Sequence, residues 1–227
     1  MSSIAYLSTA PSLLVCLDFD GTISELNPDP YAVKPHPVAL EAIERLAHAP
    51  NTEVAMLSGR HLEGLRRVFP LRNPVVLVGS HGAEPGPELT PEDVAYLDAI
   101  EQQLEAIAVP PAYVEVKPYQ RVLHVAPVGD AAERERMLAE ALRIQTPRPV
   151  TPGNNVVEFS AVDVSKGSWL RTHKQRFAAT LFAGDDVTDD TALAVLGPAD
   201  VGIKVGVDVA GVDEMAAFLK ALADARC

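Results

Sequence analysis

The chain has 227 residues, with 31 Asp and Glu against 19 Lys and Arg, which gives a formal net charge of −12. This length suits one large α/β domain or a core that carries a smaller insert, and a hydrophobic content of 48% excludes a disordered or fibrous chain. The acidic balance argues against binding to nucleic acid or to an anionic membrane, because both need a basic surface. An anionic substrate is still allowed, because a bound metal ion can reverse the local field.

Disulfide and targeting signals are weak in this sequence. Cys16 lies in an apolar run and is typical of a core residue, while Cys227 ends the chain, so no disulfide framework is predicted. No apolar run is long enough for a transmembrane helix, and the first basic residue is Lys34, which argues against a signal peptide. We therefore predict a monomeric cytoplasmic protein that binds neither membrane nor nucleic acid.

The first part of the chain alternates short apolar runs with helical patterns. Residues 13–17 form a continuous apolar run, as expected of a strand that is buried on both faces. A helical repeat over residues 40–46 ends before Pro50, and residues 54–57 and 75–78 predict two further strands.

Proline clusters then divide the chain. Prolines within residues 85–91 and 147–152 indicate connectors, because proline interrupts helices and central strands. We therefore predict an inserted module at residues 86–153, with a core made of residues 1–85 and 154–227. The elements predicted for the insert and its surroundings are a helix that begins at Thr90-Pro91, an antiparallel strand pair at residues 113–117 and 121–126, a helix opened by Asp130, and a further strand at residues 156–159.

Alternation of strand and helix resumes after the insert. The predicted elements are a helix around Trp169, a strand at residues 180–183, a helix at residues 189–196, an edge strand at residues 201–205 and a last helix at residues 212–223. This order favours the α/β class: a Rossmann-like, mostly parallel sheet covered on both faces, with an inserted α+β module.

Polar residues follow the predicted strands, where parallel sheets bind their ligands. The first strand ends in Asp18-Phe19-Asp20-Gly21-Thr22. Two carboxylates after a buried strand are costly unless they are paired or metal-bound, and Thr22 offers a hydroxyl and an amide to an anion. The other clusters are Ser58-Gly59-Arg60 after the second strand, Lys166-Gly167 before a helix, and Gly184-Asp185-Asp186 with Asp189-Asp190 after the fourth strand.

Each cluster taken alone has a structural explanation, such as a turn or a helix cap. Together, however, they combine a hydroxyl and amides suited to phosphate, a cation, and an oxygen-only set suited to Mg²⁺. Their coincidence favours one site for a phosphate ester.

The same segments resemble a known superfamily. Asp18–Thr22, Ser58, Lys166 and residues 184–189 are similar to the four signature motifs of haloacid dehalogenase-like phosphatases, and the position of the insert resembles their C2-type cap. Within that superfamily the chain most resembles the trehalose-6-phosphate phosphatase family. This closer resemblance rests on residues 57–60, 79–84 and 184–190, and on cap segments around Glu115, Lys117, His124 and Glu158.

The resemblance implies a Mg²⁺-dependent phosphomonoester hydrolase that acts on a sugar phosphate through an aspartyl-phosphate. The resemblance implies that Asp18 is the nucleophile, that Asp20 is the general acid and base, and that Ser58 and Lys166 contact the transferring oxygens. It implies that Asp18, the Asp20 carbonyl and Asp185 ligate Mg²⁺, supported by Asp186 and Asp189. The residues that it implies for substrate binding are Thr22, Ser58, Gly59, Arg60, Glu115, Lys117 and Glu158. Arg60 could equally pair with an acid on the following helix, and the cap Glu and Lys could equally form an exposed pair on one strand face.

Three hypotheses stay open at this point. The first is hydrolysis of trehalose 6-phosphate, and the second keeps the chemistry but takes sucrose phosphate or mannosyl-3-phosphoglycerate. The third is a phosphoacceptor signalling module, which also clusters Asp, a hydroxyl and Lys around Mg²⁺. The length of the chain, the insert and the position of Asp20 argue against the third.

Overall fold

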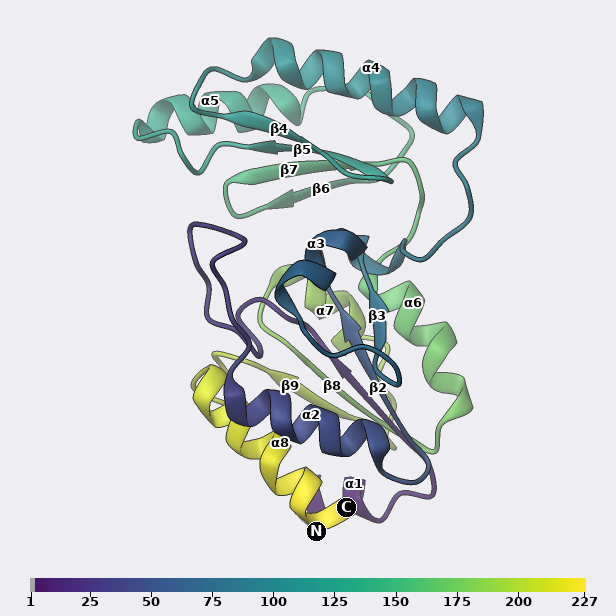
Figure 1. Ribbon diagram of the computed structural model, residues 1–227. Helices are drawn as coiled ribbons and strands as arrows, with labels where there is room; N and C mark the ends of the chain where they lie inside the picture. The colour runs from purple at the N-terminus through teal and green to yellow at the C-terminus, as the bar shows by residue number, and fades with distance from the viewer. Residues whose placement is uncertain (1–2) are drawn as a thin grey trace. The chain divides into compact units, whose positions relative to one another are not determined.

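The computed structural model describes residues 3–227 and divides into two compact units. One unit combines the chain up to Pro85 with Val164–Cys227, and the other is Gly86–Asp163. Figure 1 shows a parallel sheet with helices on both faces in the first unit, and helices α4 and α5 beside an antiparallel sheet in the second.

The first unit is built on a five-stranded sheet in the order β3-β2-β1-β8-β9. All of its neighbouring strands pair in parallel. The strands are β1 (Leu13–Leu17), β2 (Thr52–Leu57), β3 (Val76–Val78), β8 (Ala179–Gly184) and β9 (Val201–Lys204). The predicted α/β class, the buried first strand and the edge strand near residue 201 are therefore confirmed.

Alternate side chains of β1 enter two separate apolar clusters. Leu13, Val15 and Leu17 pack with α1 (Ser3–Ser8), α2 (Pro37–His48) and α8 (Val212–Arg226). Leu14 and Cys16 pack on the other face, with residues of α6 (Lys166–His173) and α7 (Val187–Leu193). Helix α3 (Leu62–Val68) follows β2, and the short 3-10 turns are η1 (Ser80–Gly82) and η2 (Lys174–Arg176). The sheet is thus buried on both faces, which explains the continuous apolar run of β1.

The second unit packs two helices on a four-stranded antiparallel sheet in the order β4-β5-β7-β6. Its elements are α4 (Pro91–Ile107), β4 (Tyr113–Val116), β5 (Gln120–His124), α5 (Ala131–Ala141), β6 (Val150–Gly153) and β7 (Val156–Ser160). Thr90 forms a capping box with Asp93 at the start of α4, and Asp130 caps α5, as the sequence predicts.

Two features of the second unit differ from the prediction. Strand β6 lies in a segment that we predict as a connector, but Pro152 is tolerated there because β6 is an edge strand. Strand β7 pairs with both β5 and β6, which keeps it in this unit. The predicted boundary at residue 153 is therefore wrong, and the second unit extends to Asp163.

In the first unit, the helix predicted at residues 189–196 begins and ends earlier, as α7 (Val187–Leu193), because Asp186 caps its N-terminus.

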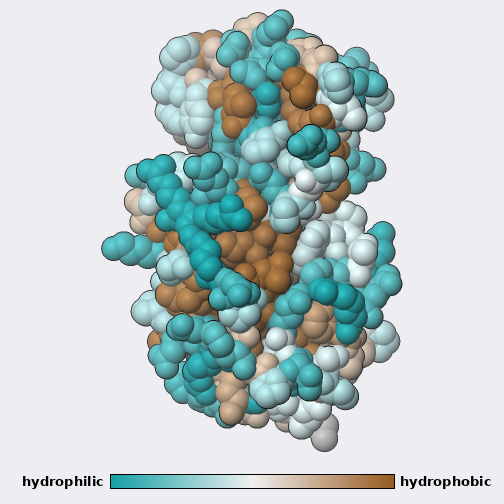
Figure 2. Space-filling view, turned by 45° about the vertical axis from the view of Figure 1, so that its right-hand side comes forward, coloured by the Kyte–Doolittle hydropathy of each residue, from teal (hydrophilic) through white to brown (hydrophobic). Residues whose placement is uncertain are grey.

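Apolar side chains are concentrated in the interior of each unit. Figure 2 shows hydrophilic residues over much of the visible face, with apolar patches between them. Cys16 is buried, which raises the pKa of its thiol, and Cys227 is exposed. Within residues 3–227, no helix combines the length and the apolar character needed to cross a membrane.

Candidate active site

The site forms where the sheet order changes direction. The chain leaves β1 toward β2 on one side, and β8 lies on the other side. Leu17 is in register with Ala183, and the Asp18 amide donates to the Ala183 carbonyl at 2.9 Å. The residues that follow β1 and β8 are therefore neighbours at the switch point, where open α/β sheets bind ligands.

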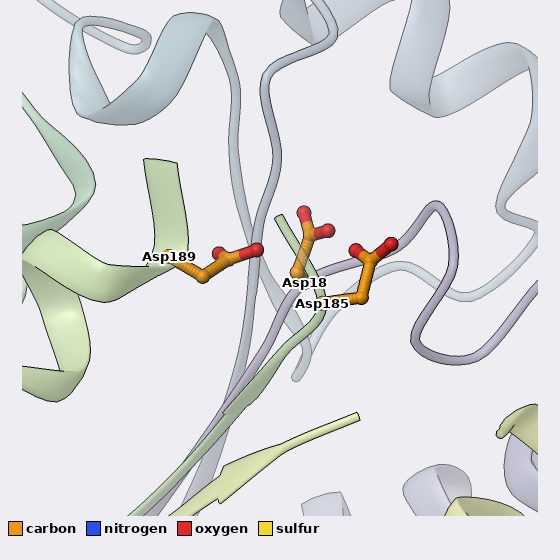
Figure 3. A group of neighbouring side chains, drawn as sticks. All are labelled: Asp18, Asp185 and Asp189. Atoms are coloured by element: carbon orange, nitrogen blue, oxygen red, sulfur yellow. The ribbon is translucent and has the colours of Figure 1, made fainter. Parts of the chain in front are cut away.

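Three carboxylates converge at this point. Asp18 follows β1, Asp185 follows β8, and Asp189 lies in α7; one oxygen of each lies within 4.8 Å of the others. Figure 3 shows the Asp18 and Asp185 carboxylates side by side and the Asp189 carboxylate pointing toward Asp18. Such an oxygen-only group has the chemistry of a site for a hard divalent cation.

Lys166 compensates part of this negative charge. Its Nζ atom lies 2.7 Å from Asp18 Oδ1 and 2.7 Å from Asp189 Oδ1. Lys166 is 2% exposed, Asp18 5% and Asp189 0%. A buried charge is tolerated only when it is paired, so the first residue of α6 and the two carboxylates depend on one another.

Burial and charge shift the pKa values in this group. Burial, opposed by Lys166, raises the pKa of Asp18 to about 8. Burial and the neighbouring Asp189 and Asp186 raise the pKa of Asp185 to about 6. Burial alone would lower the pKa of Lys166, but Asp18 and Asp189 outweigh it and hold that pKa above its usual range. A divalent cation at Asp18 and Asp185 would relieve the cost of ionising both carboxyls.

The remaining acids of the α7 segment have structural partners. Asp189 accepts from Lys166 through Oδ1 and from the Asp186 amide through Oδ2, the latter at 3.0 Å. Asp186 accepts from the Val187 amide at 2.6 Å, as the N-cap of α7. Asp190 pairs with Lys204 at 2.6 Å. Asp189 is therefore anchored on both of its oxygens, whereas Asp190 lies in an ion pair.

Arg60 holds Asp20 by two contacts. Its Nε atom lies 2.6 Å from Asp20 Oδ2, and its Nη2 atom 2.7 Å from Asp20 Oδ1. Its Nη1 atom donates to the Pro30 carbonyl at 2.6 Å. Arg60 thus pairs with an acid, as one of the sequence alternatives allows, but the acid follows β1 rather than lying on the next helix. Two-point contacts of this kind fix the orientation of a carboxylate.

Ser58 and Thr22 place hydroxyls near the same sheet edge. Ser58 follows β2, is 1% exposed, and accepts from the Arg60 amide at 3.1 Å. Thr22 is fully buried, and its hydroxyl has no hydrogen-bond partner among the described residues. A buried hydroxyl without a partner is uncommon and is a candidate ligand contact.

Gly21 fits the backbone closely around the carboxylates. Its φ is +71°, and a Cβ atom there would lie 2.0 Å from Asp185 Oδ2. Only glycine lets the loop after β1 approach Asp185 this closely. Together with the unpartnered Thr22 hydroxyl and the oxygen-only donor set, this cradle fits a small hard cation such as Mg²⁺.

The sequence indicates no role for Glu84, which the structure places beside residues Ser58-Gly59-Arg60, here called the Ser58 segment. Glu84 is buried, and its Oε2 atom accepts from the Leu62 amide at 2.6 Å and from Ser80 Oγ at 3.0 Å. Its only sequence signal is its place in the segment at residues 79–84.

The predicted sugar-contacting residues lie together on the sheet of the second unit. Glu115 and Glu158 are both in register with Val122, on either side of β5, so they share one face of the sheet. His124 Nε2 lies 2.8 Å from Glu115, and Lys117 Nζ lies 3.0 Å from Glu158. The acids are thus paired with neighbouring bases in a cluster of side chains that can donate and accept hydrogen bonds.

A parallel α/β core with an Asp-rich switch point, interrupted by an α+β cap, defines the fold of haloacid dehalogenase-like phosphatases. The model of the family described as trehalose-phosphatase matches residues 16–221. The chain therefore belongs to the trehalose-phosphatase family.

Individual relatives agree with this assignment. The chain is 32% identical over 218 residues to the trehalose-phosphate phosphatase of Mycobacterium marinum, which covers 87% of this chain and 55% of that protein. The chain thus spans about half the length of the curated relatives it matches.

Solved structures share the fold at lower identity. The C-terminal domain of C. albicans trehalose-6-phosphate phosphatase aligns with a TM-score of 0.77 and 16% identity, over 97% of this chain and 96% of that chain. The sucrose-phosphatase of Synechocystis sp. aligns with a TM-score of 0.52 and 18% identity, over 87% and 84% of the two chains. These likenesses establish the capped core fold.

Proposed function

We propose that this chain is a Mg²⁺-dependent phosphomonoester hydrolase that converts trehalose 6-phosphate to trehalose and inorganic phosphate. The observation that carries the proposal is the buried Asp18 at the switch point, in contact with Lys166 and beside Asp185. Membership of the trehalose-phosphatase family supports the choice of substrate.

The residues present fit a single Mg²⁺ ion. Asp18, Asp185 and the backbone carbonyl of Asp20 would ligate it, and Asp189 and Asp186 would orient these ligands without binding the ion themselves. When bound, Mg²⁺ supplies positive charge that lets a carboxylate and a phosphate dianion approach one another. The anchored oxygens of Asp189 suit a supporting role, because Lys166 and the Asp186 amide already engage them.

In the first half-reaction, an Asp18 carboxylate oxygen attacks phosphorus while the bond from phosphorus to the sugar oxygen breaks. Asp20 gives its proton to the leaving sugar oxygen, so trehalose departs neutral and the phosphoryl group stays on Asp18. Because Arg60 engages both Asp20 oxygens, this pair must open before Asp20 meets the leaving group.

In the second half-reaction, water attacks the phosphorus of the aspartyl-phosphate. Asp20 takes a proton from the water, the bond from phosphorus to Asp18 breaks, and inorganic phosphate leaves with Asp18 restored. Lys166, Ser58, the Gly59 amide and Thr22 would hold the transferring oxygens, where phosphoryl transfer depends most on positioning and charge.

The second unit would supply sugar recognition. Glu115 and Glu158 accept from vicinal hydroxyls, and Lys117 donates to them. The hydrogen bond between Glu115 and His124 and the ion pair between Lys117 and Glu158 hold these groups in fixed orientations before a sugar binds. A cytoplasmic location and a monomeric state stay predictions.

Phosphate release from a panel of sugar phosphates with Mg²⁺ tests the proposal. Trehalose 6-phosphate is expected to give the highest kcat/KM, ahead of sucrose phosphate and mannosyl-3-phosphoglycerate. Asp18→Asn is expected to abolish release, whereas Asp213→Asn, at an exposed carboxylate, serves as the matched control. Preference for another sugar would overturn the substrate, and full activity of Asp18→Asn would overturn the mechanism. A stable aspartyl-phosphate without sugar turnover would support a phosphoacceptor module instead.

A further inference from the structure

The turn at residues 79–84 belongs to the sequence motifs, but the proposed mechanism gives it no role. It follows β3 and contains three consecutive residues at positive φ, namely Ser80 at 49°, His81 at 55° and Gly82 at 111°. Two of these are not glycine. Strained backbone of this kind persists only where the surroundings enforce it, and it is concentrated at functional sites.

This turn is bonded to the Ser58 segment along its length. The Ser80 amide donates to the Arg60 carbonyl at 2.7 Å, and the His81 amide donates to the Ser58 carbonyl at 3.0 Å. The His81 ring also covers Gly59 so closely that a Cβ atom there would lie 2.5 Å from His81 Cε1. The backbone that presents the Ser58 hydroxyl and the Gly59 amide therefore takes its shape from this turn.

Glu84 closes the arrangement from the end of the turn. One oxygen, Oε2, accepts both from the Leu62 amide and from the Ser80 hydroxyl. The carboxylate thus ties the first residue of α3, two positions after Arg60, to the strained part of the turn. It is 8% exposed, and a buried carboxylate loses more than a surface one when its donors are removed.

The other side of the turn faces the start of α6. A Cβ atom at Gly82 would lie 2.9 Å from Trp169 Cβ and 3.2 Å from the Ser165 carbonyl. Ser165 is the N-cap of α6, and Lys166 is its first residue. The turn therefore touches both segments that are placed to bind phosphate, the Ser58 segment and the Lys166 helix.

We propose that Glu84 is a positioning residue that holds the Ser58 segment in its phosphate-binding conformation through the turn at residues 79–84. This inference rests on the proposed function, because it assigns phosphate binding to Ser58. Glu84 acts through Ser58, because its hydrogen bonds are made to the Leu62 amide and the Ser80 hydroxyl, which flank the Ser58 segment.

The test measures the affinity of the full chain for inorganic phosphate by calorimetry, with Mg²⁺ present. Glu84→Met removes both hydrogen bonds and is expected to weaken phosphate binding about tenfold, the size of one charge-assisted hydrogen bond. Glu84→Gln keeps an oxygen that can accept both donors and is expected to restore most of the affinity. Glu63→Met, on the exposed side of α3, is the matched control and is expected to bind phosphate like the unsubstituted chain.

A double-mutant cycle separates positioning from general loss of structure. Ser58→Ala and Glu84→Met are expected to be non-additive, so that adding Glu84→Met to Ser58→Ala weakens phosphate binding less than twofold. If Glu84→Met does not fold, Ser80→Ala replaces it in the cycle and is expected to weaken binding about threefold, because it removes one of the two donors to Oε2. Additive effects in the cycle, or equal losses for Glu84→Gln and Glu84→Met, would overturn the inference.

The binding readout does not depend on turnover of a sugar. A chain that binds phosphate with this coupling but hydrolyses no trehalose 6-phosphate would support the role of Glu84 and refute the proposed substrate. Hydrolysis of trehalose 6-phosphate with an additive cycle would refute the role of Glu84 and leave the proposed function intact.

Discussion

Replacing Lys166 by Met tests how strongly the site depends on this buried cation. Lys166 Nζ contacts Asp18 and Asp189 at 2.7 Å each, and all three residues are buried. Removing one partner of a buried ion pair costs about 3–5 kcal/mol, because the other charge is left uncompensated. Lys166→Met is therefore expected to lower the free energy of unfolding by about 3–5 kcal/mol at pH 8 without metal.

The loss should depend on pH, with a sign that follows from Asp18. Burial already raises the pKa of Asp18 from 3.8 to about 8, and without Lys166 that pKa rises further. Below pH 8 both folded chains hold a proton that their unfolded forms have released, so both lose stability in parallel as the pH rises. Above pH 8 the unsubstituted chain releases this proton, whereas the folded variant keeps it and continues to lose stability. The deficit relative to the unsubstituted chain is therefore expected to be larger at pH 9 than at pH 6, by about 1 kcal/mol, since one pKa unit corresponds to about 1.4 kcal/mol.

Urea unfolding of both chains at pH 6 and pH 9 measures this difference directly. Lys220→Met is the matched control, because it removes an exposed lysine from a surface pair with Asp224 and should change stability far less. Added Mg²⁺ is expected to recover part of the loss by replacing the missing charge. A deficit of the same size at both pH values would refute the argument that Lys166 acts by compensating buried carboxylates.

Three further predictions address the metal site and the cap. Gly21→Ala should abolish Mg²⁺ binding in calorimetry while leaving the chain folded, because its Cβ atom would collide with the Asp185 carboxylate. Unchanged Mg²⁺ affinity would contradict the claim that the close approach of Gly21 to Asp185 shapes the metal site. Mg²⁺ binding at pH 7 should release protons, and its affinity should rise from pH 6 to pH 8, because Asp18, with a pKa of about 8, and Asp185, with a pKa of about 6, must ionise to ligate the metal. Calorimetry in buffers of different ionisation enthalpy measures the proton release, and binding without proton release would argue against these ligands. Thr90→Ala should destabilise the second unit by about 1 kcal/mol in urea unfolding, the usual cost of an N-cap, without changing Mg²⁺ affinity.

The core fold could be predicted from local patterns because its strands are short, mostly apolar segments that alternate with helical patterns. Leu13–Leu17 is such a segment, and the polar residues after each strand mark the sheet edge where the site forms. The capping pairs at Thr90 and Asp130 are also local, and the structure has both.

The remaining features depend on contacts between distant segments. The two-point contact of Arg60 with Asp20 joins residues 40 positions apart, and no local pattern distinguishes it from a pair on α3. Strand β6 contains Pro152, so its own sequence argues against a strand, and only its edge position allows it. The bonds of Glu84 to Leu62 and Ser80 likewise require the folded turn.

The central claim is that Asp18 carries the phosphoryl group during hydrolysis of a sugar phosphate. The most direct test mixes the chain with Mg²⁺ and trehalose 6-phosphate that carries radioactive phosphorus, quenches the reaction rapidly in acid, and maps the labelled peptide. The account predicts label on the Asp18 peptide that appears and decays within a turnover, and no label on Asp18→Asn. Phosphate release at an undiminished rate from Asp18→Asn, or release from the unsubstituted chain with no label ever on Asp18, would contradict it.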